Sequence, residues 1–156
     1  TKGEIPTLVI GTHASALPGR TLREEPYTFV CQGEGPHTVK ALVDALKSDR
    51  NFSKTPGLWY TDKDGTERSN QPAPLISDLD QELPQQAWDL LDMNKYRAHN
   101  WHCFEDLQRQ PYASVYTSLG CPYHCSFCCI QAPFKSGELA LGLQAKVNSY
   151  RYSRND

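Results

Sequence analysis

The stretch YTFVCQGEGPHTVKALVDAL, residues 27–46, contains a complete strand–turn–helix pattern. Residues 27–31 are aromatic and β-branched, which favours a strand, and the glycines of GEG at residues 33–35 indicate a tight turn. Thr38 is expected to cap the helix that follows, whose apolar positions repeat with the helical period: Val39, Leu42, Val43 and Leu46. The stretch therefore predicts a strand that leads through a glycine turn into an amphipathic helix.

A second unit of the same kind precedes this stretch. Residues 8–10 form a short apolar run that ends at Gly11, typical of a buried strand entering a turn. After the break at Pro18-Gly19, residues 21–25 are expected to form a short polar helix or turn. Strand, crossover, strand and helix in this order predict a parallel α/β sheet. About two units are present, fewer than a complete doubly wound domain needs.

The residues after this region differ in composition. Residues 57–61 and 66–68 flank an Asp-Gly turn at 62–65, which predicts a small β-hairpin. An extended connector follows at residues 71–74, and residues 80–92 mix acidic with apolar side chains. We interpret this part as an interdomain linker that packs on both neighbours. Its acidic residues are expected to form a solvated face: Asp78, Asp80, Glu82, Asp89 and Asp92.

A third region begins with ASVYTSL, residues 113–119, which has the β-branched and aromatic content of a strand. Gly120 ends this strand, and the loop CPYHCSFCC, residues 121–129, follows at once with four of the chain's six cysteines. In α/β barrels, functional groups lie in loops at the carboxyl ends of the strands. The sequence therefore predicts the first strand of a barrel and its functional loop.

The bulk composition limits the classes of function. The chain has 156 residues, a formal net charge of −2 and 22% charged residues, which does not favour a nucleic-acid or membrane-surface binder. No apolar run of about 18 residues predicts a membrane span, and no leader predicts secretion. We therefore expect a cytoplasmic protein whose cysteines serve metal or redox chemistry. Because the chain opens on Thr1 rather than methionine, we expect an internal piece of a longer protein.

The cysteine spacing C-x3-C-x2-C is formed by Cys121, Cys125 and Cys128. Three thiolates on one loop can bind three irons of a cubane cluster. Since no fourth cysteine stands at a usual ligand spacing, one iron would be left open. An open iron is a binding site, so the pattern favours a reactive 4Fe-4S cluster over a passive electron carrier.

A zinc site is the alternative, with Cys125 and Cys128 as one ligand pair and Cys121, His124 or His102 completing the tetrahedron. We favour the cluster, because structural zinc sites usually bring a second ligand pair on a separate knuckle. A disulfide between adjacent cysteines would be strained. The remaining cysteines are expected to pack as small buried hydrophobes: Cys31, Cys103 and Cys129.

The segment GCPYHCSFC, residues 120–128, resembles the cluster motif of the radical S-adenosylmethionine superfamily, C-x3-C-x-aromatic-C. The resemblance implies that Cys121, Cys125 and Cys128 bind a 4Fe-4S cluster and that Phe127 lies beside the adenine of S-adenosylmethionine. It also implies that reduction of the cluster yields a 5′-deoxyadenosyl radical, with electrons from a donor such as flavodoxin or ferredoxin.

The two amino-terminal turns resemble those of the cobalamin-binding domain that precedes the radical domain in one large class of this superfamily. There the strings are close to G-G-x-H-x-x-x-x-P and V-x-G-E-G-E, whereas here Ile10 replaces the first glycine and Pro36 the last acid. Turns at the carboxyl ends of parallel strands line the ligand crevice of a doubly wound sheet. The resemblance implies that six residues face cobalamin: Gly11, Thr12, His13, Gly33, Glu34 and Gly35.

The resemblance implies an α/β fold in three parts. Residues 1–50 would be the carboxyl-terminal part of a doubly wound, Rossmann-like cobalamin-binding domain, 51–111 a linker with a hairpin, and 112–156 the start of a radical-type (β/α) barrel. The implied activity is methylation of an unactivated carbon of a small molecule. A radical enzyme that cyclises or rearranges its substrate without functional cobalamin, and a non-catalytic zinc module, are the alternatives. The fragment alone is expected to be inactive.

Overall fold

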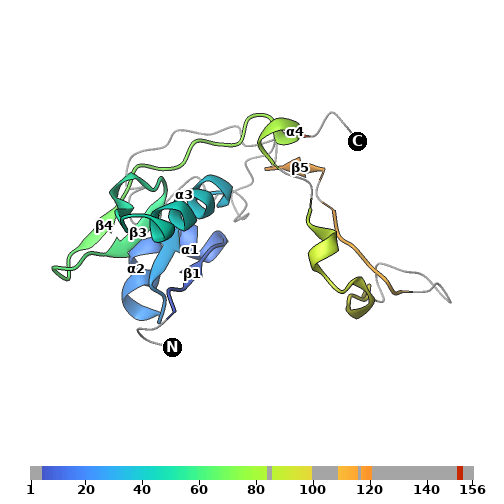
Figure 1. Cartoon of the computed structure of the whole chain (residues 1–156), viewed down its shortest axis with the longest axis horizontal. Helices are drawn as coiled ribbons and strands as arrows, with labels where there is room; N and C mark the ends of the chain where they lie inside the picture. The colour runs from blue at the N-terminus through green and yellow to red at the C-terminus, as the bar shows by residue number, and fades with distance from the viewer. Residues whose placement is uncertain (1–4, 84–85, 100–108, 116, 121–150, 153–156) are drawn as a thin grey trace.

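The computed structural model describes residues 5–83, 86–99, 109–115, 117–120 and 151–152 (Figure 1). Its regular elements lie mostly in the first half of the chain. In order they are β1 (Leu8–Val9), α1 (Thr12–Ala16), α2 (Pro18–Glu24), β2 (Phe29–Cys31), α3 (Pro36–Lys47), η1 (Phe52–Lys54), β3 (Leu58–Thr61), β4 (Glu67–Ser69), α4 (Leu79–Glu82), η2 (Trp88–Leu90), η3 (Met93–Lys95), β5 (Ser118–Leu119) and β6 (Arg151–Tyr152).

The first four strands form one sheet in the order β1-β2-β3-β4. Strands β1 and β2 are parallel, with Leu8 opposite Phe29 and Val9 opposite Val30. Strand β3 pairs antiparallel with β2, and β4 closes the hairpin against β3. The predicted parallel unit and the predicted hairpin are both present, but the hairpin continues the amino-terminal sheet instead of standing apart from it.

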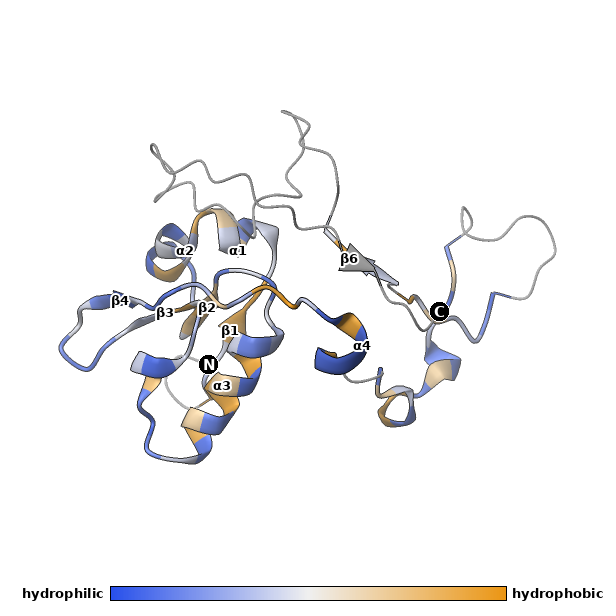
Figure 2. Cartoon of the chain, turned by 90° about the horizontal axis from the view of Figure 1, so that it is seen from above, coloured by the Kyte–Doolittle hydropathy of each residue, from blue (hydrophilic) through white to orange (hydrophobic). Residues whose placement is uncertain are grey.

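Helices cover both faces of this sheet. Neighbouring side chains of a strand point to opposite faces, so the apolar strands of this sheet present side chains that must be buried on both. On one face Val30 packs with Ala14 of α1, Leu22 of α2 and Trp59 of β3. On the other face Phe29 packs with Leu42 of α3 and with further apolar side chains: Leu58, Tyr60, Leu8, Leu46 and Phe52. Figure 2 shows α1 and α2 on one side of the strands and α3 on the other. The result is a mixed α/β layer arrangement, compatible with a Rossmann-like domain.

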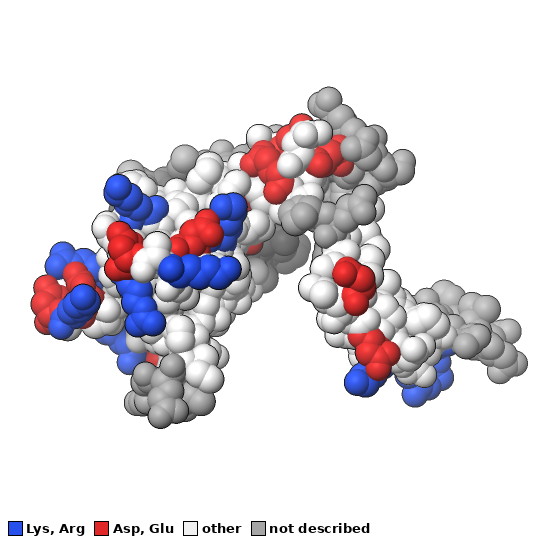
Figure 3. Space-filling model, viewed as in Figure 1, with Lys and Arg blue, Asp and Glu red and all other residues white. Residues whose placement is uncertain are grey.

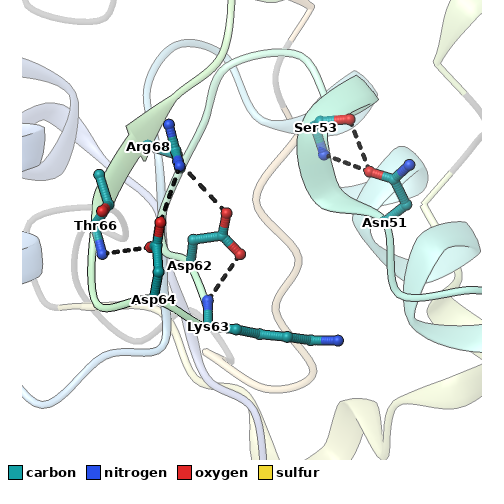
Figure 4. A network of polar contacts seen from close by, with 7 residues as sticks. All are labelled: Asn51, Ser53, Asp62, Lys63, Asp64, Thr66 and Arg68. Atoms are coloured by element: carbon teal, nitrogen blue, oxygen red, sulfur yellow. Dashed lines mark hydrogen bonds and ion pairs between the residues drawn. The ribbon is translucent and has the colours of Figure 1, made fainter.

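The hairpin turn is held by its own polar residues (Figure 4). The backbone N–H of Gly65 donates to the carbonyl of Asp62 at 2.9 Å, and the Asp64 carboxylate accepts from the Thr66 N–H at 2.8 Å. Arg68 extends from β4 to both carboxylates, 3.5 Å from Asp62 and 3.3 Å from Asp64. The Asp-Gly turn expected from the sequence is therefore confirmed.

Two local predictions were wrong. Thr38 does not cap α3, because the helix begins at Pro36 with Gly35 in the cap position. Proline suits the first turn of a helix, since its missing N–H would have no partner there. Residues 113–115 form no strand, and β5, limited to Ser118–Leu119, pairs antiparallel with β6. The described residues therefore do not confirm the start of a barrel.

Two apolar side chains of the linker, Ile76 and Leu79, are buried, while acidic side chains gather on the outside of α4 (Figure 3). Of the five acidic residues expected to form a solvated face, four are exposed and Asp80 is half-buried; the exposed ones are Asp78, Glu82, Asp89 and Asp92. Within the described ranges, no helix has the length and the apolar character needed to cross a bilayer.

Candidate functional site

The two glycine turns lie at the same edge of the sheet, because β1 and β2 are parallel and each turn follows the carboxyl end of its strand. Ser15 of α1 joins them. The N–H of Gly33 donates to the Ser15 hydroxyl at 3.1 Å, and that hydroxyl lies 3.5 Å from the carbonyl of Gly33. Ser15 is fully buried. The structure therefore brings the turn at residues 11–13 and the turn at residues 33–35 together.

The glycines in these turns are required by the backbone. Gly11, Gly33 and Gly35 have φ angles of 137°, 112° and 103°, and residues other than glycine rarely adopt such angles. A Cβ at Gly11 would meet no atom within 4 Å, whereas a Cβ at Gly35 would lie 3.3 Å from Cγ2 of Ile10. Ile10, the residue that departs from the family pattern, therefore lies over the second turn, and 45% of its surface is exposed.

Thr12 and His13 form the exposed side of this edge. They open α1 directly after Gly11, and no side chain caps the helix. Both residues are exposed, whereas Ala14 and Ser15, the next two, are buried. Their side chains can therefore reach a ligand at the edge of the sheet.

Glu34 has a different environment from the other predicted residues. Its carboxylate Oε2 accepts a hydrogen bond from the backbone N–H of Ile76 at 3.0 Å, across 42 residues of sequence. Ile76 is completely buried. The side chain of Glu34 therefore holds the linker, while the backbone of its turn lies at the sheet edge.

Two buried polar side chains on either side of the second turn, Gln32 and Thr38, form hydrogen bonds that the sequence did not predict. Gln32 accepts from the indole N–H of Trp59 at 2.9 Å, and its own N–H donates to the carbonyl of Gly57 at 2.8 Å. Thr38 donates to the carbonyl of Pro56 at 2.7 Å. Because these partners are 18 to 27 residues apart, sequence spacing alone carried no signal for them.

Cys31, the β2 residue that precedes Gln32, is fully buried, as expected of a small hydrophobe. Burial raises the pKa of its thiol, although a hydrogen bond with Thr38 acts in the opposite direction. A protonated, inaccessible thiol is a poor nucleophile and a poor metal ligand. Cys31 therefore belongs to the core.

A second contact joins the linker to α3. Nε2 of His37 lies 3.3 Å from Oε2 of Glu82, close enough for charge attraction, although the imidazole is not aligned as a hydrogen-bond donor. The other carboxylate oxygen of Glu82 accepts from the N–H groups of Ser77 and Asp78, each at 2.9 Å. These backbone hydrogen bonds, with a smaller contribution from His37, lower the pKa of Glu82 to about 2.

The predicted cluster ligands lie outside the described residues: Cys121, Cys125 and Cys128, together with Phe127 and the zinc alternatives His102 and His124. Within the described part of the chain, no three His, Cys, Asp or Glu side chains come together as a metal-binding group.

Comparisons with known proteins return relatives named mainly as methyltransferases, together with the 4′-phospho-dehydrooxetanocin synthase of Priestia megaterium, which is 25% identical over 116 residues. A protein of Pyrococcus horikoshii named as an uncharacterized methyltransferase is 40% identical over 119 residues, which cover 76% of this chain and 24% of the relative. The cytidylyl-2-hydroxyethylphosphonate methyltransferase of Streptomyces wedmorensis is 27% identical over 151 residues, covering 80% of this chain and 27% of the relative. The hopanoid C-3 methylase of Methylococcus capsulatus is 32% identical over 123 residues, covering 76% and 21%.

The chain spans about a quarter of the length of these curated relatives. No protein-family profile matches it, and no solved structure matches it significantly. These three relatives are named for methyl transfer, and the chain combines the cysteine spacing with the paired glycine turns. The chain is thus related, over about three quarters of its own length, to proteins named as methyltransferases, and its cysteine spacing and paired glycine turns resemble those of radical S-adenosylmethionine proteins with a cobalamin-binding-type domain.

Proposed function

We propose that the chain is part of a cobalamin-dependent radical S-adenosylmethionine enzyme that methylates an unactivated carbon of a small molecule. The observation that carries the proposal is the pair of turns that Ser15 joins at the carboxyl edge of β1 and β2. Relatives named as methyltransferases support the reaction class.

The described residues fit a bulky ligand at this edge. Gly11 and Gly33 offer backbone without side chains, in conformations that a side chain would strain. Thr12 and His13 add exposed polar groups beside them. We assign to these residues, with Gly35 and the backbone of Glu34, the binding of cobalamin, which would supply the methyl group.

The cysteine loop would hold the second cofactor set. Cys121, Cys125 and Cys128 offer three thiolates, the donor chemistry of a 4Fe-4S cluster with one open iron. S-adenosylmethionine would bind there beside Phe127, and on reduction by a donor such as flavodoxin or ferredoxin it would supply the 5′-deoxyadenosyl radical that opens the C–H bond. Cluster thiols must stay reduced, which suits the cytoplasm.

The proposal keeps three parts of the chain. Residues 1–50 would end the cobalamin-binding domain, 51–111 would link the domains, and 112–156 would begin the radical domain. The hairpin of β3 and β4 adds its strands to the sheet of the first part, so the linker would begin structurally after Ser69.

The test uses the protein at the length of its relatives, purified without oxygen and supplied with iron and sulfide. We expect about four irons per chain, and 5′-deoxyadenosine when dithionite and S-adenosylmethionine are added. Cys125→Ala should abolish the product, whereas the matched variant Cys129→Ala should retain it. Zinc in place of iron, or no 5′-deoxyadenosine from the wild type, would contradict the proposal.

A second candidate is a radical enzyme of another reaction type without functional cobalamin. Ile10 favours the second candidate. The family pattern has a glycine in place of Ile10, and the Ile10 side chain lies over Gly35. Hydroxocobalamin titration separates the two: the first candidate predicts binding by the wild type, and the second predicts binding only after Ile10→Gly, or none. The 5′-deoxyadenosine assay is the same for both.

A further inference from the structure

We propose that Glu34 is a positioning residue that makes the linker and the ligand-facing turn move as one unit. The inference rests on the proposed function, because it assigns cobalamin to the turn at residues 33–35. The inference goes beyond the proposed function by giving the Glu34 side chain a role toward residues 76–82 of the linker, in place of a direct contact with the ligand.

The first step of the argument is the anchor itself. Ile76 has no exposed surface, and a buried backbone N–H without an acceptor is costly. Glu34 supplies that acceptor at 3.0 Å. A hydrogen bond to a charged acceptor is stronger than one between neutral groups. The linker therefore depends on this carboxylate for its placement on the sheet edge.

The second step is the position of Glu34 in its turn. It lies between Gly33 and Gly35, whose positive φ angles fix the direction in which its side chain leaves the backbone. Gly33 is in turn bound to Ser15 of α1. A displacement of the linker would therefore be passed through Glu34 to the turn and to α1.

The third step is a second attachment on the same side. Helix α3 begins directly after Gly35, and His37 in its first turn faces Glu82 at 3.3 Å. Leu79, between the two attachment points, is buried. The linker is thus held at Ile76 and at Glu82 against two consecutive parts of the chain, the turn and the start of α3.

Coupling of this kind is reciprocal. If the linker stabilises the turn that binds a ligand, the ligand must stabilise the linker by the same free energy. Bound cobalamin should therefore protect the amides of residues 76–82, and loss of the anchor should weaken cobalamin binding.

The test compares wild type, Glu34→Ala, Glu34→Gln and the exposed control Glu24→Ala at the length of the relatives, by hydrogen exchange and by hydroxocobalamin titration. In Glu34→Ala, peptides covering 75–83 should exchange about tenfold faster and the Kd should rise about tenfold, as loss of one charged hydrogen bond implies. Glu34→Gln keeps an acceptor and should stay within about threefold of wild type. Glu24→Ala should match wild type.

Equal exchange of residues 75–83 in Glu34→Ala and Glu24→Ala would overturn the proposal. So would equal affinity of wild type and Glu34→Ala, or failure of hydroxocobalamin to slow exchange in that segment. A wild type that binds no hydroxocobalamin overturns both this coupling and the cobalamin assignment, while the 5′-deoxyadenosine assay still tests the radical chemistry. If Glu34→Ala does not fold, Glu34→Asp, with its shorter carboxylate, must give the same directions.

Discussion

The hydroxyl group of Ser15 and the N–H of Gly33 form a hydrogen bond of 3.1 Å that joins the turns after β1 and β2. Because Ser15 has no exposed surface and Gly33 is half-buried, water has little access to the N–H that loses its partner in Ser15→Ala. We expect this variant to lower the free energy of unfolding by about 1–3 kcal/mol, the cost of leaving a buried donor without an acceptor. Urea denaturation followed by tryptophan fluorescence measures it.

Ser53→Ala is the matched control, because the Ser53 hydroxyl is exposed and donates to the neighbouring Asn51. An exposed substitution of this kind should change stability by no more than about 0.5 kcal/mol. Equal effects of the two alanine variants would show that the bond between the turns does not stabilise the fold.

Gly57 and Gly65 separate backbone strain from steric exclusion. Both have positive φ angles, 69° and 81°. A Cβ at Gly57 would lie 2.6 Å from the carbonyl oxygen of Gln32, whereas a Cβ at Gly65 would meet nothing within 4 Å. Gly65→Ala should therefore cost only the left-handed penalty, about 1–2 kcal/mol, and Gly57→Ala clearly more, in thermal or urea denaturation. Equal losses would contradict the close packing of Gly57 against the carbonyl of Gln32.

The strand, turn and helix of residues 27–46 were predictable because each signal there is local. Phe29–Cys31 has β-forming side chains, two glycines follow, and α3 shows the helical period. Thr38 was misread as a cap because a threonine before an apolar period fits that role equally well. Its hydroxyl instead donates to Pro56, a partner that only the folded sheet brings near.

The strand expected at 113–119 failed for a different reason. β-Propensity reports how a side chain packs on a sheet, so it needs a partner strand to take effect. Within the described residues only Ser118–Leu119 has one. In the candidate site, the glycines were predictable from their turns, but the contacts of Ser15 and Glu34 were not, because they join residues 18 and 42 positions apart.

Cys31 should be unreactive in the folded protein. Its thiol is buried and its pKa is raised by that burial, so both access and thiolate fraction are low at neutral pH. We expect iodoacetamide to modify Cys31 at least roughly a hundredfold more slowly in the native protein than in guanidinium, because reaction requires opening of the core. Peptide-resolved mass spectrometry measures this rate separately from the other cysteines. Rapid native modification would contradict the buried placement.

Glu82 should make the stability of the chain depend on acid pH. Its pKa falls from 4.5 to about 2 on folding, mainly through hydrogen bonds from the backbone of Asp78 and Ser77. A lowered folded-state pKa means that the ionised carboxylate stabilises the fold. This contribution is complete above about pH 4.5 and is lost as the pH falls toward 2.

Glu82→Gln removes this titration while keeping the side chain's size, so wild type should be more stable than the variant at neutral pH and the difference should disappear as the pH approaches 2. Urea denaturation of both proteins across this pH range measures it. Because hydrogen bonds rather than the His37 charge cause most of the shift, added salt should leave the difference nearly unchanged. A difference that salt removes would mean that the contact with His37 holds Glu82 in place of the backbone N–H groups of Ser77 and Asp78. A difference that is constant with pH would mean that neither contact stabilises its ionised form.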